Sequence, residues 1–130
     1  MHIGVPKEIK VLEHRVGLTP ESVREARAHG HDVVVEMRAG QGIGMDDDAY
    51  RRAGATIAAT AAEVFDRADM IVKVKEPQAA ERRMLKRGQL LFTYLHLAPD
   101  PEQAAELIGS GAVCIAYETV TSKNLSLIHI

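Results

Sequence analysis

The sequence predicts an α/β fold with a doubly wound, mostly parallel sheet and helices on both faces, built as one domain over residues 1–121. Short apolar runs alternate with helical stretches along almost all of this region. Several runs are too continuously apolar for strands with one face in water, which is typical of parallel strands covered on both sides. Alternating strands and helices require crossover connections, and these place the strands parallel to one another.

Runs rich in apolar and β-branched residues are the expected strands. They are His2–Val5, Asp32–Met37, Met70–Val74, Leu90–Tyr94 and Val113–Tyr117. A helical segment lies between each run and the next. Ala, Val, Ile and Leu must fill the interior, because aromatic residues make up only 4% of the chain and Trp is absent.

Capping residues mark the expected helices. Thr19 is placed as an N-cap, Pro20 fits the first turn, and Glu21 brings an acid to the positive end of the helix dipole. Gly30 fits the end of this helix. The same kinds of signal predict further helices at Asp47–Ala53 before Gly54, from Thr60 through Arg67, at Ala79–Lys86 before Gly88, and from Asp100 to Gly109 or Gly111.

Composition argues against several classes of protein. A formal net charge of -2 gives no electrostatic reason to expect nucleic acid or an anionic membrane as a partner. No segment approaches the roughly 18 apolar residues that span a bilayer, and the first residues do not resemble a secretory signal. The one cysteine, Cys114, lies in an apolar run and is expected to be a small core residue. We therefore expect a cytoplasmic protein.

Residues 122–130 differ from the rest of the sequence. They combine polar residues with an apolar end, Leu125–Ile130, and contain no helix cap. A parallel sheet that ended on such a segment would expose an apolar edge. We expect this segment to be foreign to the natural protein or disordered, and the chain to be a truncated piece of a longer one.

Titratable residues follow four of the predicted strands. Arg15 lies in the polar loop after the first strand, and Lys75, His96 and Glu118 follow the third, fourth and fifth. In open α/β sheets, ligands bind outside the carboxyl ends of the strands. We therefore expect Arg15, Lys75 and His96 at one edge of the sheet.

These residue types suit a small anionic substrate. The guanidinium of Arg15 offers a planar, two-pronged match to a carboxylate. The ammonium of Lys75 can hold a second oxygen of the same molecule, and the imidazole of His96, between two leucines, is suited to moving a proton at neutral pH. Together they predict a site for a 2-oxo acid or an amino acid. No histidine has the spacing of a metal ligand, so no metal is expected.

Simpler roles for the three residues stay open on the sequence alone. Arg15 and Lys75 also fit solvated surface positions, since both lie in or next to charged loops. His96 also fits a structural histidine that is hydrogen-bonded to the backbone. The glycines of Gly40–Gly44 invite a dinucleotide-binding interpretation, but they lack the G-x-G-x-x-G spacing, and the acids Asp46–Asp48 that follow would repel a pyrophosphate. A loop that leads into a capped helix explains them better.

Longer motifs resemble a known family. The opening segments Gly4–Lys10, Glu13–Val16 and Leu18–Pro20 resemble alanine dehydrogenases and the related proton-translocating transhydrogenases. The segments Lys73–Pro77, Leu91–Ala98 and Ala116–Val120 resemble alanine dehydrogenases proper. The resemblance covers residues 1–121 without an evident gap.

The resemblance implies roles for particular residues. Arg15 matches the arginine that binds the substrate carboxylate, Lys75 the lysine on the carboxylate and carbonyl side of pyruvate, and His96 the catalytic histidine. Tyr94 and Glu118 lie in shared motifs and are expected to support these three. Such enzymes are typically homohexamers with a Rossmann-like substrate domain that convert L-alanine and NAD to pyruvate, ammonia and NADH. Their NAD is bound by a further domain, which these residues do not contain, so the chain alone is expected to be inactive.

Two rival interpretations remain. The first is the corresponding domain of a transhydrogenase subunit, which binds NAD without amino-acid chemistry. By resemblance that family lacks the histidine in the motif Leu95–Leu97, so His96 favours alanine dehydrogenase. The second is a non-catalytic α/β binding module, in which Arg15, Lys75 and His96 would not converge.

Overall fold

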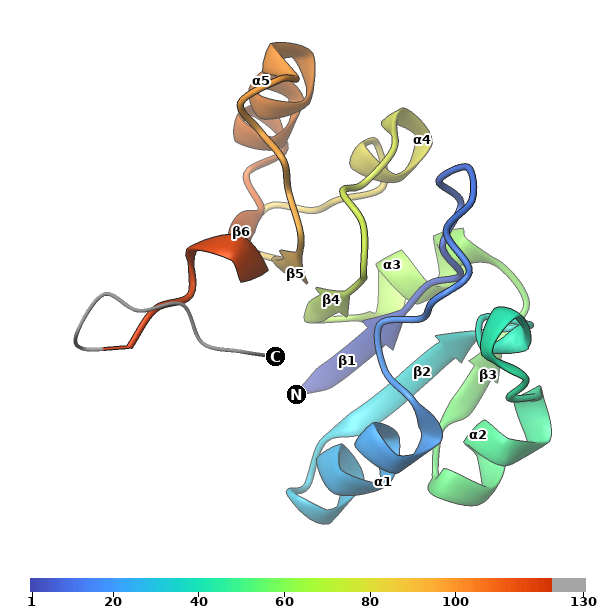
Figure 1. Ribbon diagram of the computed structural model, residues 1–130. Helices are drawn as coiled ribbons and strands as arrows, with labels where there is room; N and C mark the ends of the chain where they lie inside the picture. The colour runs from blue at the N-terminus through green and yellow to red at the C-terminus, as the bar shows by residue number, and fades with distance from the viewer. Residues whose placement is uncertain (123–130) are drawn as a thin grey trace.

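The computed structural model describes residues 1–122 and contains a six-stranded parallel sheet in the order β3-β2-β1-β4-β5-β6 (Figure 1). The strands are β1 (His2–Val5), β2 (Asp32–Glu36), β3 (Thr56–Ala58), β4 (Met70–Val72), β5 (Leu90–Thr93) and β6 (Val113–Ala116). The helices are α1 (Pro20–Ala28), α2 (Asp47–Ala53), α3 (Ala61–Arg67), α4 (Ala79–Arg82) and α5 (Pro101–Ser110), with 3-10 turns at Gln41–Ile43 and Tyr117–Thr119. This is the strand order of a Rossmann-like sheet, so the predicted α/β class is confirmed.

The structure corrects the predicted elements in three places. The strand β3 was not predicted, because its three residues include only one large apolar side chain, Ile57, whereas the equally short β4 is apolar throughout. Helix α4 ends at Arg82 rather than Lys86, since the Lys86 amide donates to the side chain of Gln89 at 3.1 Å instead of to a helix carbonyl. The strands β2, β4, β5 and β6 end one or two residues before their predicted ends.

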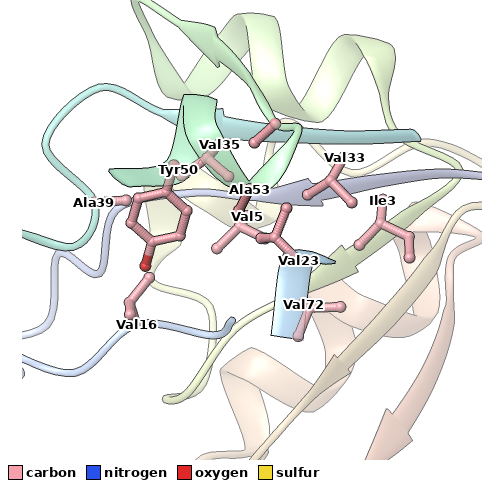
Figure 2. Close-up of a cluster of buried hydrophobic side chains, with 11 residues drawn as sticks. Ile3, Val5, Val16, Val23, Val33, Val35, Ala39, Tyr50, Ala53 and Val72 are labelled. Carbon is pink, nitrogen blue, oxygen red and sulfur yellow. The ribbon is translucent and has the colours of Figure 1, made fainter. Parts of the chain in front are cut away.

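Alternate residues of the central strands pack on opposite faces of the sheet. Ile3 and Val5 of β1 face α1 and α2, in a cluster that also contains Val23 and the fully buried Tyr50 (Figure 2). The other face packs against α3 and α5 through a second cluster, which includes Val34, Val64, Ile71, Leu91 and Leu107. Helices therefore cover both faces, as a doubly wound sheet requires.

Side-chain N-caps form at the starts of α1, α2, α3 and α5, and those predicted at Thr19, Thr60 and Asp100 are confirmed. Their side chains accept a hydrogen bond from the backbone amide three residues on, which satisfies one donor of the first helical turn. The pairs are Thr19 with Ser22, Asp46 with Ala49, Thr60 with Glu63, and Asp100 with Gln103. Gly54 and Gly111 end α2 and α5 in the left-handed conformation, at φ 105° and 75°.

Two remaining expectations concern Cys114 and the end of the chain. Cys114 is half-buried and packs against the second cluster, and burial raises the pKa of its thiol. The expectation for residues 122–130 falls outside the described residues except at Ser122. Within residues 1–122, no helix is long and apolar enough to cross a membrane.

Candidate active site at the carboxyl edge of the sheet

The loops after β1, β4, β5 and β6 leave the sheet at one edge, because all the strands run parallel. β1 and β4 are neighbours at the centre of the sheet. The chain continues from β1 to β2 on one side and from β4 to β5 on the other, so the two connections diverge. A crevice forms where strand order reverses in this way, and it is the usual ligand site of such sheets.

Lys75 lies three residues beyond β4, and its backbone is held from both neighbouring strands. Its amide donates to Oε1 of Glu8 at 3.0 Å, and its carbonyl accepts from the hydroxyl of Thr93 at 2.9 Å. Glu8 follows β1, and Thr93 ends β5. Sequence reasoning identified Lys75 but missed both residues that hold it, because each is distant in sequence.

Arg15 is exposed, but its side chain is held by an ion pair. Its Nε and Nη2 groups donate to the two carboxylate oxygens of Glu13 at 2.9 and 2.8 Å, and its amide donates to the same carboxylate at 2.9 Å. The hydrogen bond from Arg15 is the main reason that the pKa of Glu13 falls to about 2. Glu13 therefore stays ionised at neutral pH and orients the guanidinium.

Glycines let other segments approach the loop that carries Arg15. A Cβ at Gly42 would lie 2.2 Å from the carbonyl oxygen of His14, and a Cβ at Gly17 would lie 2.4 Å from that of Val72. Only glycine fits at such a close approach of backbone to backbone. The glycine-rich segment before α2 thus packs on the Arg15 loop and leads into a capped helix, as predicted, with Asp46 as the cap.

His96 lies after β5 in a left-handed conformation, with φ 48°, that is uncommon for a residue other than glycine. The preceding residue is fixed on both sides. The amide of Leu95 donates to Glu118 at 2.9 Å, and its carbonyl accepts from the side chain of Gln103 at 2.8 Å. Strained backbone of this kind persists where the surroundings determine it, and it is frequent at active sites.

Gln103 was missed by the sequence analysis. It is fully buried in the first turn of α5, and we interpreted it only as part of the helix start. The available signal was its position four residues before the buried Leu107, on the core face of the helix. A glutamine on that face needs a polar partner, and here the partner is the loop that carries His96.

Tyr94 and Glu118 support the site in different ways. Glu118 holds the loop before His96, as described above. The Tyr94 ring packs edge-on against Tyr117, at a centroid distance of 4.9 Å, and its centroid lies 6.5 Å from that of His96. Tyr117 in turn donates its hydroxyl to the carbonyl of Lys73 at 2.8 Å, and burial raises its pKa.

The predicted site residues are brought to the same edge, though not all to the same surface. Arg15 and Tyr94 line one hollow of about 330 Å³, and Tyr94 connects it to His96. Lys75 does not line this hollow, but its charge helps to lower the pKa of Glu13. The two cations therefore act on the same carboxylate. Among residues 1–122 no three potential metal-binding side chains gather.

Comparison with known proteins identifies the family. Residues 4–128 match the family described as alanine dehydrogenase/PNT, N-terminal domain. The chain belongs to this family. It is 52% identical over 122 residues to the alanine dehydrogenase of Halomonas elongata, a match that covers 94% of this chain and 33% of the relative. It is 51% identical over 121 residues to that of Bacillus subtilis, covering 93% of this chain and 32% of the relative.

Solved structures of this family have the same fold. A structure titled L-alanine dehydrogenase superposes with a TM-score of 0.94 at 50% identity, over 98% of this chain and 35% of that one. The transhydrogenase from Sinorhizobium meliloti gives a TM-score of 0.87 at 32% identity, over 95% of this chain and 36% of that one. The chain spans about a third of the length of the relatives it matches.

Proposed function

We propose that this chain supplies the substrate-binding and acid–base part of an NAD-dependent alanine dehydrogenase, which converts L-alanine reversibly to pyruvate and ammonia. The observation that carries the proposal is the set of groups at the carboxyl edge: Arg15 and Tyr94 on one hollow, His96 beside Tyr94, and Lys75 close enough to act on the partner of Arg15. The named alanine dehydrogenases at 51–52% identity support it.

Arg15 is arranged to bind a carboxylate without releasing Glu13. Glu13 occupies the edge of the guanidinium formed by Nε and Nη2. The other edge, formed by Nη1 and Nη2, also carries two parallel N–H groups, and no residue of 1–122 bonds to Nη1. A substrate carboxylate can pair with that edge in the two-pronged geometry that arginine favours.

Lys75 and His96 complete the chemistry in this proposal. The ammonium of Lys75 would neutralise the substrate carboxylate or polarise the carbonyl oxygen of pyruvate. The imidazole of His96 would accept and return the proton as the amino group is added or lost, because imidazole is the side chain most often used for general acid–base catalysis. Its exposed side chain leaves it open to substrate and solvent.

The glycine-rich segment before α2 does not fit the pyrophosphate of NAD. The segment Gly40–Gly44 is occupied by packing: a Cβ at Gly40 would meet Tyr50 at 2.6 Å, and Gly42 lies on the Arg15 loop. Acidic residues follow at Asp46–Asp48, where a pyrophosphate would be repelled. We therefore propose that NAD, the hydride acceptor, is held by residues beyond this domain.

A chimeric enzyme tests the proposed function. Residues 1–122 replace the matching third of the Bacillus subtilis relative, so that the remaining two thirds of that protein are supplied. We expect L-alanine-dependent formation of NADH, and its loss by at least about 100-fold when His96 is replaced by Ala, as for a general acid–base group. A folded chimera with no activity, or full activity without His96, would contradict the proposal.

The isolated chain provides the complementary test. Since we propose that residues beyond this domain hold NAD, the purified 130-residue chain should produce no NADH from L-alanine. NADH formation by the chain alone would overturn that part of the proposal.

The relation to transhydrogenase gives a second candidate, a domain that takes part in binding NAD(H) and has no amino-acid chemistry. The match to the Sinorhizobium meliloti transhydrogenase favours it, but at 32% rather than 50% identity. The two candidates differ in ligand. Pyruvate should perturb Arg15 and His96 in an alanine dehydrogenase domain, and it should have no effect in the other.

A further inference from the structure

The side chain of Glu8 lies in the gap between β1 and β4 and is 1% exposed. The two strands pair through Ile3 with Met70 and Gly4 with Ile71. The pairing ends there. For the amides that follow β4, the carboxylate of Glu8 is the hydrogen-bond acceptor in place of a carbonyl of the neighbouring strand. It receives the amide of Val74 at 3.2 Å and that of Lys75 at 3.0 Å.

The three residues Lys73–Lys75 have a partner for every backbone polar group. Glu8 accepts two of these groups, the amides of Val74 and Lys75. The other four pair with residues at the end of β5 and in the 3-10 turn after β6. The remaining partners are Phe92 O for the Lys73 amide, the Tyr117 hydroxyl for the Lys73 carbonyl, the Tyr94 amide for the Val74 carbonyl, and the Thr93 hydroxyl for the Lys75 carbonyl. This segment therefore has one backbone position, although it lies outside any strand.

Lys73 makes the burial of Glu8 feasible. Its Nζ lies 3.1 Å from Glu8 and 2.9 Å from Glu81, and all three side chains are 1–2% exposed. A buried carboxylate without such a partner would be strongly unfavourable. Burial raises the pKa of Glu81, the second carboxylate beside Lys73.

We propose that Glu8, neutralised by Lys73, is a positioning residue that fixes the backbone of Lys75 and thereby places its ammonium for the substrate carboxylate. The inference rests on the proposed function of Lys75. A lysine side chain is a flexible four-carbon stem. The region that its ammonium can occupy is therefore defined only if the backbone that carries it is fixed. Glu8 determines that backbone without touching the substrate.

Amide exchange and pyruvate titration of the complete 130-residue chain, both followed by NMR, test this inference. Glu8→Gln keeps the shape of the side chain but turns one acceptor oxygen into a donor. We expect exchange at Val74 or Lys75 to accelerate by about tenfold or more, and pyruvate to bind about tenfold more weakly, the effect of one lost hydrogen bond to a charged group.

Glu36→Gln is the matched control. Glu36 is a carboxylate that, like Glu8, accepts a backbone amide at the carboxyl edge, from Lys7 at 2.9 Å; it is half-buried, and in the described residues it makes no hydrogen bond to the segment Lys73–Lys75. It should leave both measurements unchanged. If Glu8→Gln does not fold, the double variant Glu8→Gln with Lys73→Met removes both charges and should restore folding while the weaker pyruvate binding remains.

The outcomes separate this inference from the proposed function. If the unmodified chain does not bind pyruvate, the proposed function fails and this inference fails with it. If the unmodified chain binds pyruvate and the folded Glu8 variant binds it equally well, only the role of Glu8 is wrong. Unchanged exchange at Val74 and Lys75 would equally overturn the role of Glu8.

Discussion

Lys75 and Arg15 are two cations at the same edge of the sheet, and the protein holds them in opposite ways. Lys75 depends on a buried carboxylate, Glu8, that fixes its backbone and is itself neutralised by Lys73. Arg15 is 60% exposed, and the side chain of Glu13, two residues away, orients its guanidinium. One is held by contacts distant in sequence, the other by a local ion pair.

This difference separates stability from binding. Removing one charge from a buried cluster leaves the others unpaired in the protein interior, which strongly lowers the free energy of unfolding. Replacing Arg15, whose side chain is 60% exposed, should cost less, about 0–1 kcal/mol as for an ion pair at the surface, although its partner Glu13 is itself only 5% exposed. We therefore expect changes around Lys75 to affect the free energy of unfolding, and changes at Arg15 to affect ligand binding alone.

The largest expected effect follows loss of the buried cation. Lys73→Met leaves Glu8 and Glu81 without their common partner and should lower the free energy of unfolding by about 3–5 kcal/mol. Urea denaturation measures this value. Adding Glu8→Gln to the variant should recover most of the loss. A Lys73→Met chain as stable as the unmodified one would show that the ion pairs of Lys73 with Glu8 and Glu81 do not stabilise the fold.

Arg15→Lys should separate binding from stability at the exposed pair. Lysine keeps the charge but loses the planar edge, so pyruvate affinity should fall by about tenfold, roughly 1.4 kcal/mol. Unfolding free energy should change by less than about 1 kcal/mol. Calorimetric titration and urea denaturation of the same sample check both values. If Arg15→Lys lowered the free energy of unfolding as much as Lys73→Met does, the distinction between the two cations would be wrong.

His96 allows a test of backbone strain at the site. Because its φ is 48°, replacement by Gly should give a chain about 1 kcal/mol more stable than replacement by Ala. Both variants lack the imidazole, so both should abolish L-alanine oxidation in the chimera. Equal thermal stability of the two variants would show that the left-handed conformation is not retained.

The smallest expected effect is on the stability of the fold at acid pH. The pKa of Glu13 is lowered from 4.5 to about 2 by its hydrogen bond from Arg15. A group whose pKa is depressed on folding stabilises the folded state above its unfolded pKa, and this contribution disappears as the pH falls through the folded value. Between about pH 4.5 and 2, the unmodified chain should therefore lose slightly more stability than Glu13→Gln. Parallel acid-unfolding curves for the two would contradict the assigned ion pair.

The sequence allowed prediction of local features and of the order in which elements occur. The caps at Thr19 and Asp100 depend on neighbours three residues away, and they formed as predicted. The places of Lys75 and His96 after their strands required only the strand boundaries. The order of the strands in the sheet was not predicted. Glu8 contacts Lys75, 67 residues away in sequence, only because β1 lies next to β4.

The missed features share this dependence on long-range contacts. Gln103 acts on Leu95 through a hydrogen bond from α5 to the loop after β5, and Gly42 approaches His14 only in the folded chain. Their sequence neighbourhoods indicate a helix start and a loop, and both indications are correct but incomplete. β3 was missed for another reason, since Ile57 is the only large apolar residue among its three.

A pyruvate titration of the complete chain, mapped residue by residue by NMR, tests the central claim most directly. We expect the largest changes at Arg15, Lys75, Tyr94 and His96, with none at the opposite edge of the sheet around His2 and Asp32. Changes confined to that opposite edge, or no change at concentrations well above those at which L-alanine and pyruvate occur in cells, would contradict the assignment of the carboxyl edge as a substrate site.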